Sequence, residues 1–109
     1  MKNGRRNGKG IQVWTNGCRY LGEWKDNSAH GRGRSEDSFG NVYEGQWEQG
    51  LANGYGTYYN LRKHVRYEGQ WKGDVKEGNG KEEQADGSVY VGGFKGGKRH
   101  GYGRMTYSD

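Results

Sequence analysis

The segment Tyr43-Glu44-Gly45-Gln46-Trp47 decides the fold of this chain, because close copies of it recur along the sequence. The copies are Tyr20-Leu21-Gly22-Glu23-Trp24, Tyr67-Glu68-Gly69-Gln70-Trp71 and Tyr90-Val91-Gly92-Gly93-Phe94. Their leading tyrosines are 23, 24 and 23 residues apart, and a Gly-x-Gly begins 11 residues after each of them. A fifth Gly-x-Gly, Gly8 and Gly10, keeps this register without a leading tyrosine. Such a period indicates a tandem-repeat protein.

Each repeat has the pattern of a β-hairpin. Tyr43, Gly45 and Trp47 alternate, and alternate residues of a strand lie on one face of a sheet. The glycine leaves bare backbone between two rings, so a ring from the neighbouring strand can lie against it. The following Gly-x-Gly, Gly54 and Gly56 in this repeat, is expected to run back as the second strand and to leave room for the stacked rings.

The repeats predict an all-β fold, an elongated single-layer antiparallel meander of tandem β-hairpins, because a lone hairpin is only marginally stable in water. The stretch 48–53 is expected to be a polar hairpin loop, and Asp86-Gly87 a two-residue turn, since glycine accepts a positive φ. Such a sheet has open faces that suit binding and lacks a buried catalytic cleft. The predicted strands cover about residues 8–14, 18–24, 31–36, 42–47, 54–59, 65–71, 78–84, 88–94 and 101–107.

The composition is unusual for a folded domain of 109 residues, since only 28% of it is hydrophobic and 23 residues are glycine. Average proteins are about 45–50% apolar, and a chain so poor in apolar residues is typical of disorder. The nine Tyr, four Trp and two Phe oppose that interpretation, because disordered chains contain few aromatic residues. The composition therefore favours a thin sheet covered by aromatic rings.

The repeated residues resemble the MORN repeat, named from "membrane occupation and recognition nexus". Its pattern is Tyr-x-Gly-x-(Trp/Phe), then His/Asn-Gly-x-Gly, then an Asp-Gly turn. Tyr43-x-Gly45-x-Trp47 with Asn53-Gly54-x-Gly56 matches it, as does Tyr90-x-Gly92-x-Phe94 with His100-Gly101-x-Gly103. The resemblance covers about residues 4–109. It divides a single domain, residues 1–109, into a partial repeat 4–19 and repeats 20–42, 43–66, 67–89 and 90–109.

Some parts of the sequence depart from this pattern. Residues 60–66 make the second repeat one residue longer, either as a tolerated surface insertion or as a protruding contact point. The second strands at 33–37 and 80–83 are charged, so we expect them to contribute little to a ring-lined face. Both ends of the chain cut through a repeat, which predicts either a longer protein or sheet edges covered by a partner.

The resemblance implies a non-catalytic scaffold or structural subunit. MORN arrays occur in junctional, ciliary and other cytoskeletal proteins, where they serve as rigid spacers or peptide-binding platforms. We therefore expect protein partners, within a larger assembly, and an intracellular location in the cytoplasm, in the cytoskeleton or cilium, or at a membrane surface. A partner helix or peptide would dock on an aromatic groove lined by Tyr20, Trp24, Tyr43, Trp47, Tyr67, Trp71, Tyr90 and Phe94.

Two alternatives stay open. The family's name and the net charge of +5 favour a module that binds anionic phospholipid, such as a phosphoinositide. Its lipid-binding residues would be Arg62, Lys63, Arg66, Lys95, Lys98 and Arg99, with a further basic cluster at Lys2, Arg5, Arg6 and Lys9. The chain could also be the regulatory repeat portion of a larger enzyme, since MORN arrays precede catalytic domains in lipid kinases and in a lysine methyltransferase.

The sequence predicts no enzyme, no cofactor and no metal site. His30 and His100 occupy a repeat position that we assign to a turn, and no metal-ligand spacing emerges. Cys18 has no histidine partner in the pattern, and a lone cysteine forms no internal disulfide. The Gly-x-Gly units lack the lysine and the helix of a phosphate loop. The single Arg32-Gly33-Arg34 is too short to favour a nucleic-acid partner.

Overall fold

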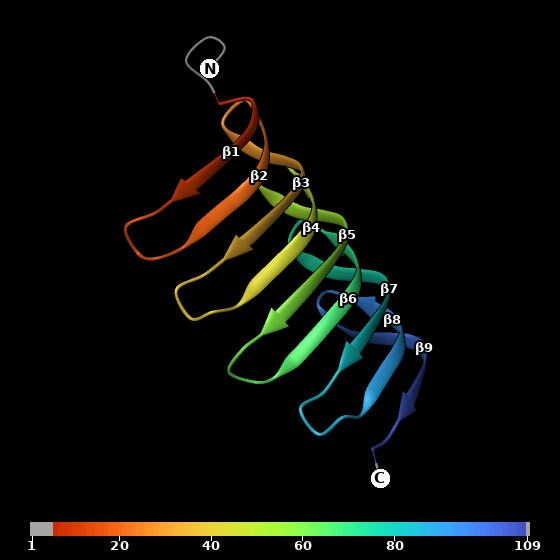
Figure 1. Cartoon of the computed structure of the whole chain (residues 1–109). Helices are drawn as coiled ribbons and strands as arrows, with labels where there is room; N and C mark the ends of the chain where they lie inside the picture. Colours follow the sequence, from red (N-terminus) through yellow and green to blue (C-terminus); the bar gives the residue numbers. More distant parts are fainter. Residues whose placement is uncertain (1–5, 109) are drawn as a thin grey trace.

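The computed structural model describes residues 6–108, which form one open sheet of nine antiparallel strands in chain order (Figure 1). This part of the chain contains no helix, and the molecule is elongated, 54 × 25 × 17 Å. The predicted all-β meander is therefore confirmed. The strands are β1 (Gly8–Val13), β2 (Arg19–Lys25), β3 (Ser28–Glu36), β4 (Val42–Glu48), β5 (Leu51–Asn60), β6 (Val65–Lys72), β7 (Val75–Glu83), β8 (Val89–Lys95) and β9 (Lys98–Thr106).

Tight two-residue turns join each even strand to the odd strand that follows it. Both residues of these turns have a positive φ, for example 51° at Gln49 and 81° at Gly50. Turns with two positive φ values match the right-handed twist of the strands. The predicted polar loop at 48–53 is therefore wrong: β5 begins at Leu51, and β3, β5, β7 and β9 all begin earlier than expected. The other turns of this kind are Asp26-Asn27, Gly73-Asp74 and Gly96-Gly97.

Wider connections join each odd strand to the next even strand, and in Figure 1 they all lie along one long side of the sheet. The predicted two-residue turn at Asp86-Gly87 is wrong. The backbone N–H of Gln84 donates to the Ser88 carbonyl oxygen at 2.8 Å, which makes the loop three residues long. Gly87, with φ 89°, supplies the left-handed residue that closes such a loop. Residues 14–18 and 37–41 have the same backbone bonds, whereas the connection at 61–64, which is one residue longer, forms an exposed loop.

Cross-strand glycine pairs let the strands bend and approach closely. Gly45 lies opposite Gly56, and the strand register shifts between Gly45 and Trp47. Figure 1 shows the strands curving sharply toward the two-residue turns, so the sheet is strongly bent and has a concave face. The equivalent glycine pairs are Gly22 with Gly33, Gly69 with Gly80, and Gly92 with Gly103.

The core is a single row of aromatic rings along the inside of this bend. Tyr20, Tyr43 and Tyr67 each pack edge-on against the second aromatic ring of their own strand and against that of the next even strand, and Tyr90, on the last even strand, packs against Phe94. The ring centroids of Tyr43 are 5.0 Å from Trp47 and 5.3 Å from Trp71. The Tyr43 hydroxyl donates to the Gln46 carbonyl oxygen at 2.8 Å, so its polar edge is satisfied. The complete row is Trp24, Tyr20, Trp47, Tyr43, Trp71, Tyr67, Phe94 and Tyr90.

This buried row makes the fold sensitive to alkaline pH. Burial raises the pKa of Tyr20, Tyr43 and Tyr67 from 10.0 to about 12. The folded state therefore favours the neutral phenols, and this stabilisation is complete below pH 10 and is lost as the pH rises through about 12.

We expect these tyrosines to ionise together with unfolding, between about pH 10 and 12. A pH titration would follow tyrosinate by ultraviolet absorbance and the sheet by circular dichroism. Ionisation of all the chain's tyrosines near pH 10 with the sheet intact would contradict the buried row.

Candidate functional site

Two adjoining cavities lie on the concave face of the sheet, and together they form what we call the trough. The larger has a volume of 590 Å³ and lies between Trp47 and Trp71. The smaller, of 350 Å³, lies between Trp24 and Trp47. Ser35 and Trp47 line both cavities, so the trough is continuous across them.

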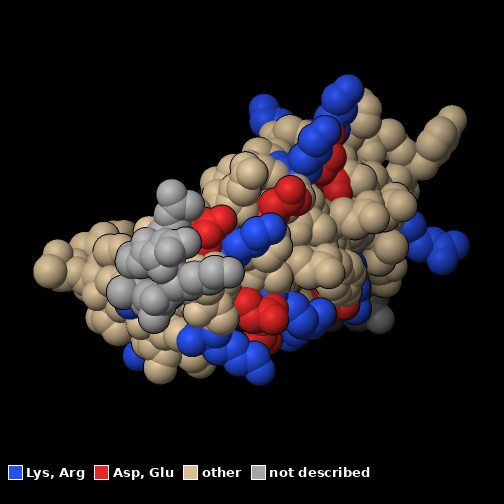
Figure 2. Space-filling model, turned by 90° about the horizontal axis from the view of Figure 1, so that it is seen from above, with Lys and Arg blue, Asp and Glu red and all other residues tan. Residues whose placement is uncertain are grey.

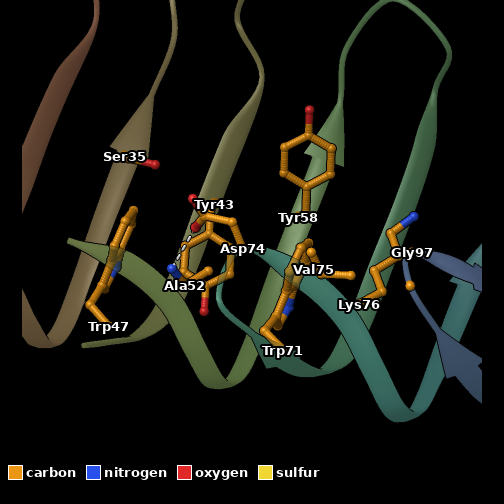
Figure 3. A pocket seen from close by; sticks show the side chains of 11 residues that line it. Ser35, Tyr43, Trp47, Ala52, Tyr58, Trp71, Asp74, Val75, Lys76 and Gly97 are labelled. Atoms are coloured by element: carbon orange, nitrogen blue, oxygen red, sulfur yellow. Dashed lines mark hydrogen bonds between the residues drawn. The ribbon is translucent and has the colours of Figure 1, made fainter. Parts of the chain in front are cut away.

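The larger cavity is bounded by residues of five strands, β3 to β7, and of the two-residue turns at 73–74 and 96–97. Figure 3 shows Trp47 and Trp71 on either side of Tyr43 and Ala52. Ala52 lies on the floor of the cavity and is 4% exposed. Asp74, from the turn between β6 and β7, accepts a hydrogen bond from the Ala52 N–H at 2.6 Å. We call the space bounded by Tyr43, Trp47, Ala52, Trp71 and Asp74 the Ala52 hollow.

One register position decides where the trough is open. The residue opposite the second aromatic ring is Ala29 for Trp24 and Ala52 for Trp47, and these small side chains leave hollows. In the next repeat this residue is Lys76, opposite Trp71. The Lys76 Nζ lies 5.1 Å from the centroid of the Tyr67 ring, so a cation covers the ring there.

The last repeat is filled in the same way, since the Arg99 Cζ lies 5.0 Å from the Tyr90 ring centroid. At the other end of the array, the Arg6 Cζ lies 4.8 Å from the Trp24 ring centroid. Cations over aromatic rings therefore stand at both ends of the array, with the two alanine positions between them.

Glu82 holds the two C-terminal cations in place. Its carboxylate accepts hydrogen bonds from Lys76 at 3.0 Å and from Arg99 at 3.1 Å, and its side chain is 13% exposed. Burial opposes ionisation of Glu82, but the bond and charge of Lys76, with bonds from Gln84 and Arg99, outweigh it and lower the pKa. The expectation that residues 80–83 contribute little to the ring-lined face is therefore wrong, because Glu82 fixes the cations that cover the rings.

The residues of the predicted aromatic groove fall into two groups. Tyr67 is 0% exposed, and the other leading tyrosines and Phe94 are also buried, so these rings belong to the core. Trp24, Trp47 and Trp71 are half-buried and line the trough. The prediction had not included Ser35 or Ala52, although the sequence carries a signal for them. Aligned by register, the repeats place Ala29 and Ala52 where Lys76 and Arg99 stand later.

The basic residues predicted to bind lipid fall into two groups that lie at opposite ends of the strands. Arg62 and Lys63 are in the exposed 61–64 loop, and Arg66 is near the start of β6. Lys95, Lys98 and Arg99 flank the two-residue turn between β8 and β9, at the other ends of the strands. Figure 2 shows basic and acidic side chains interspersed on the face that it presents. Of the N-terminal basic cluster, Lys2 and Arg5 lie outside the described residues.

The residues with catalytic or metal-binding chemistry are scattered. His30 and His100 lie within β3 and β9, so their assignment to turns is wrong. Cys18 is a free, half-buried thiol. Residues 6–108 contain no group of three His, Cys, Asp or Glu side chains that could hold a metal ion. No helix in that part of the chain could span a membrane.

The stacked hairpins and the ring-lined trough define an open β-repeat array. The family model of the MORN repeat matches residues 1–19, 20–37, 43–60, 67–89 and 90–109, which together make up most of the sequence. The chain therefore belongs to the MORN repeat family, as the sequence predicted. This family is generally non-enzymatic, and its repeats generally serve as interaction modules. A sequence comparison with curated proteins gave no match.

Proposed function

We propose that this chain is a non-catalytic scaffold that docks a helix or extended peptide of a partner protein in the trough. The observation that carries the proposal is the pair of alanines, Ala29 and Ala52, which leave Trp24, Trp47 and Trp71 accessible along two adjoining cavities. Half-exposed tryptophans beside pockets are the side chains that most often dominate binding energy at protein interfaces.

We propose that the partner belongs to a larger assembly, of the cytoskeletal or ciliary kind in which MORN arrays occur. The rigid rows of rings and glycines suit a spacer, because each repeat contacts only its neighbours and the array needs no further core. A role as the repeat portion of a larger enzyme would use the same trough for docking.

A substitution that fills the trough tests this function without weakening the fold. Ser35 stands opposite Tyr20, as Tyr58 stands opposite Tyr43 one repeat later. Ser35→Tyr therefore places in the trough a side chain that the fold already accepts, and Tyr58 packs 6.2 Å from Trp71. Trp47→Ala is less informative, because Trp47 is itself part of the core row.

We expect affinity isolation of the full chain from its own cells to recover a defined set of proteins, and Ser35→Tyr to reduce that recovery at least about tenfold. Leu21→Ser is the control, since Leu21 is 54% exposed and lies on the opposite face of the sheet, outside the trough. Partner recovery by folded Ser35→Tyr at the wild-type level would contradict docking in the trough.

Binding to anionic phospholipid is the second candidate, and one surface feature favours it. Leu61 is 45% exposed in the same loop as Arg62 and Lys63, and Phe39 is 64% exposed on the preceding wide connection, where Asn41 accepts a hydrogen bond from the Leu61 N–H. Exposed apolar side chains next to basic ones suit the surface of an acidic membrane. Sedimentation with phosphoinositide vesicles tests it. Charge reversal at Arg62 and Lys63 should abolish binding, and equal binding to neutral vesicles would rule this candidate out.

A further inference from the structure

The trough shows, within the chain itself, which chemical group suits it. The Lys76 ammonium stands 5.1 Å from the centroid of the Tyr67 ring and 3.0 Å from a Glu82 carboxylate oxygen. Arg99 repeats the arrangement over Tyr90 and pairs with the same carboxylate. Where the register position carries a basic side chain, a cation therefore lies between an aromatic ring and an acid.

The Ala52 hollow also combines an aromatic ring with an acid and has alanine in place of the lysine, although its acid comes from the turn between β6 and β7 and Tyr58 stands at the register position of Glu82. It offers the Tyr43 ring, flanked by Trp47 and Trp71, and the alanine leaves free the space that Lys76 fills one repeat later (Figure 3). The acid is Asp74, whose carboxylate lines the cavity and accepts one hydrogen bond from the Ala52 N–H. The pKa of the Tyr43 phenol is raised first by burial and second by the negative charge of Asp74, so this charge acts at the ring.

The hollow contains an acidic side chain although the whole chain carries a net charge of +5. Two charged residues line the cavity, Asp74 and Lys76. The Lys76 ammonium is held by Glu82, which also pairs with Arg99, whereas no basic side chain within residues 6–108 forms an ion pair with Asp74. The Asp74 carboxylate is therefore the acid in the hollow that a cation from a partner could pair with.

We propose that the Ala52 hollow binds a lysine or arginine side chain of the docked partner, in the way that Lys76 lies over Tyr67. This inference rests on the proposed function of the trough. Cations bind favourably over the faces of tyrosine and tryptophan, and a carboxylate strengthens the contact by a charge-assisted hydrogen bond. The partner segment is therefore basic at the point where it crosses β5, with apolar neighbours against the two tryptophans.

Two peptide probes test the proposal on the full chain. One is the capped pentapeptide Gly-Leu-Arg-Leu-Gly, and the other replaces its arginine by citrulline, which has a similar shape and no charge. Nuclear magnetic resonance of the Trp47 and Trp71 indole N–H groups, at low salt, reports binding. We expect the arginine peptide to bind about tenfold more tightly than the citrulline peptide.

Substitutions then locate the source of that preference. Asp74→Asn retains the oxygen that accepts the Ala52 N–H and removes the charge, so most of the preference should disappear. Ala52→Lys puts the chain's own cation into the hollow and should weaken the arginine peptide at least about tenfold. Glu44→Gln removes a negative charge from the opposite face and should leave the preference unchanged.

The outcomes separate this inference from the proposed function. Equal binding of the two peptides at Trp47 and Trp71 would overturn the cation site and leave docking in the trough intact. Indole signals that neither peptide perturbs would overturn both. If Ala52→Lys does not fold, Asp74→Asn decides alone, and an unchanged preference in that variant would overturn the cation site.

Discussion

Gly45→Ala is expected to lower the free energy of unfolding by about 3 kcal/mol or more, or to prevent folding altogether. A β-carbon at residue 45 would lie 2.5 Å from the Tyr55 carbonyl oxygen and would overlap the α-carbon of Gly56. Both obstacles are backbone atoms, so no side-chain rotation can relieve the overlap. The two strands would have to separate at the point where the sheet bends.

Gly10→Ala is the matched control for this substitution. Gly10 also lies opposite a glycine across the sheet, Gly22, but its added β-carbon would come no closer than 3.4 Å to the Trp24 ring. We expect this variant to stay within about 1 kcal/mol of the wild type. Chemical denaturation followed by circular dichroism gives both values. Equal stability of the two variants would show that the glycine pairs do not determine the close approach of the strands.

Tyr67→Ala is expected to cost about 3–5 kcal/mol of stability, as truncation of a buried aromatic residue usually does. Tyr67 is 0% exposed, and its ring centroid lies 5.0 Å from both Trp71 and Phe94. Its loss interrupts the row of rings between adjacent repeats, so the array would lose the coupling between its two halves.

Two other variants show which part of Tyr67 matters. Tyr67→Phe keeps the ring and loses only the hydrogen bond to the Gln70 carbonyl oxygen, so about 1 kcal/mol is expected. Tyr102→Ala removes a tyrosine that is 98% exposed, and its stability should be close to that of the wild type. Denaturation curves in which Tyr67→Ala matches Tyr102→Ala would be inconsistent with a core made of stacked rings.

The repeat pattern allowed the strand order and the ring-on-glycine packing to be predicted, because both follow from local alternation. The Tyr43 ring does lie over Gly56, as the spacing of rings and glycines indicated. The turns were harder to predict. Asparagine is common in turns, which pointed to Asn53, yet the chain reverses at Gln49 and Gly50. Glutamine rarely takes a positive φ. The strong twist of the hairpin imposes that conformation, and no propensity of glutamine predicts it.

The candidate site could be predicted only in outline. The sequence identified the aromatic rings, but their exposure depends on the bend at the glycine pairs, which buries the tyrosines and leaves the tryptophans at the surface. The Ala52 hollow depends on Asp74, which is 22 residues from Ala52 in the chain and reaches it across a neighbouring hairpin. Contacts of this kind become visible only once the sheet is folded.

Photo-cross-linking from inside the trough tests the central claim, that the concave face is the docking surface. A photoreactive phenylalanine analogue would replace Ser35 in one variant and Leu21, on the opposite face, in another. The account predicts that the residue 35 variant, irradiated in its own cells, becomes linked to a defined partner protein, whereas the residue 21 variant does not. A protein linked at residue 21 and not at residue 35 would contradict it.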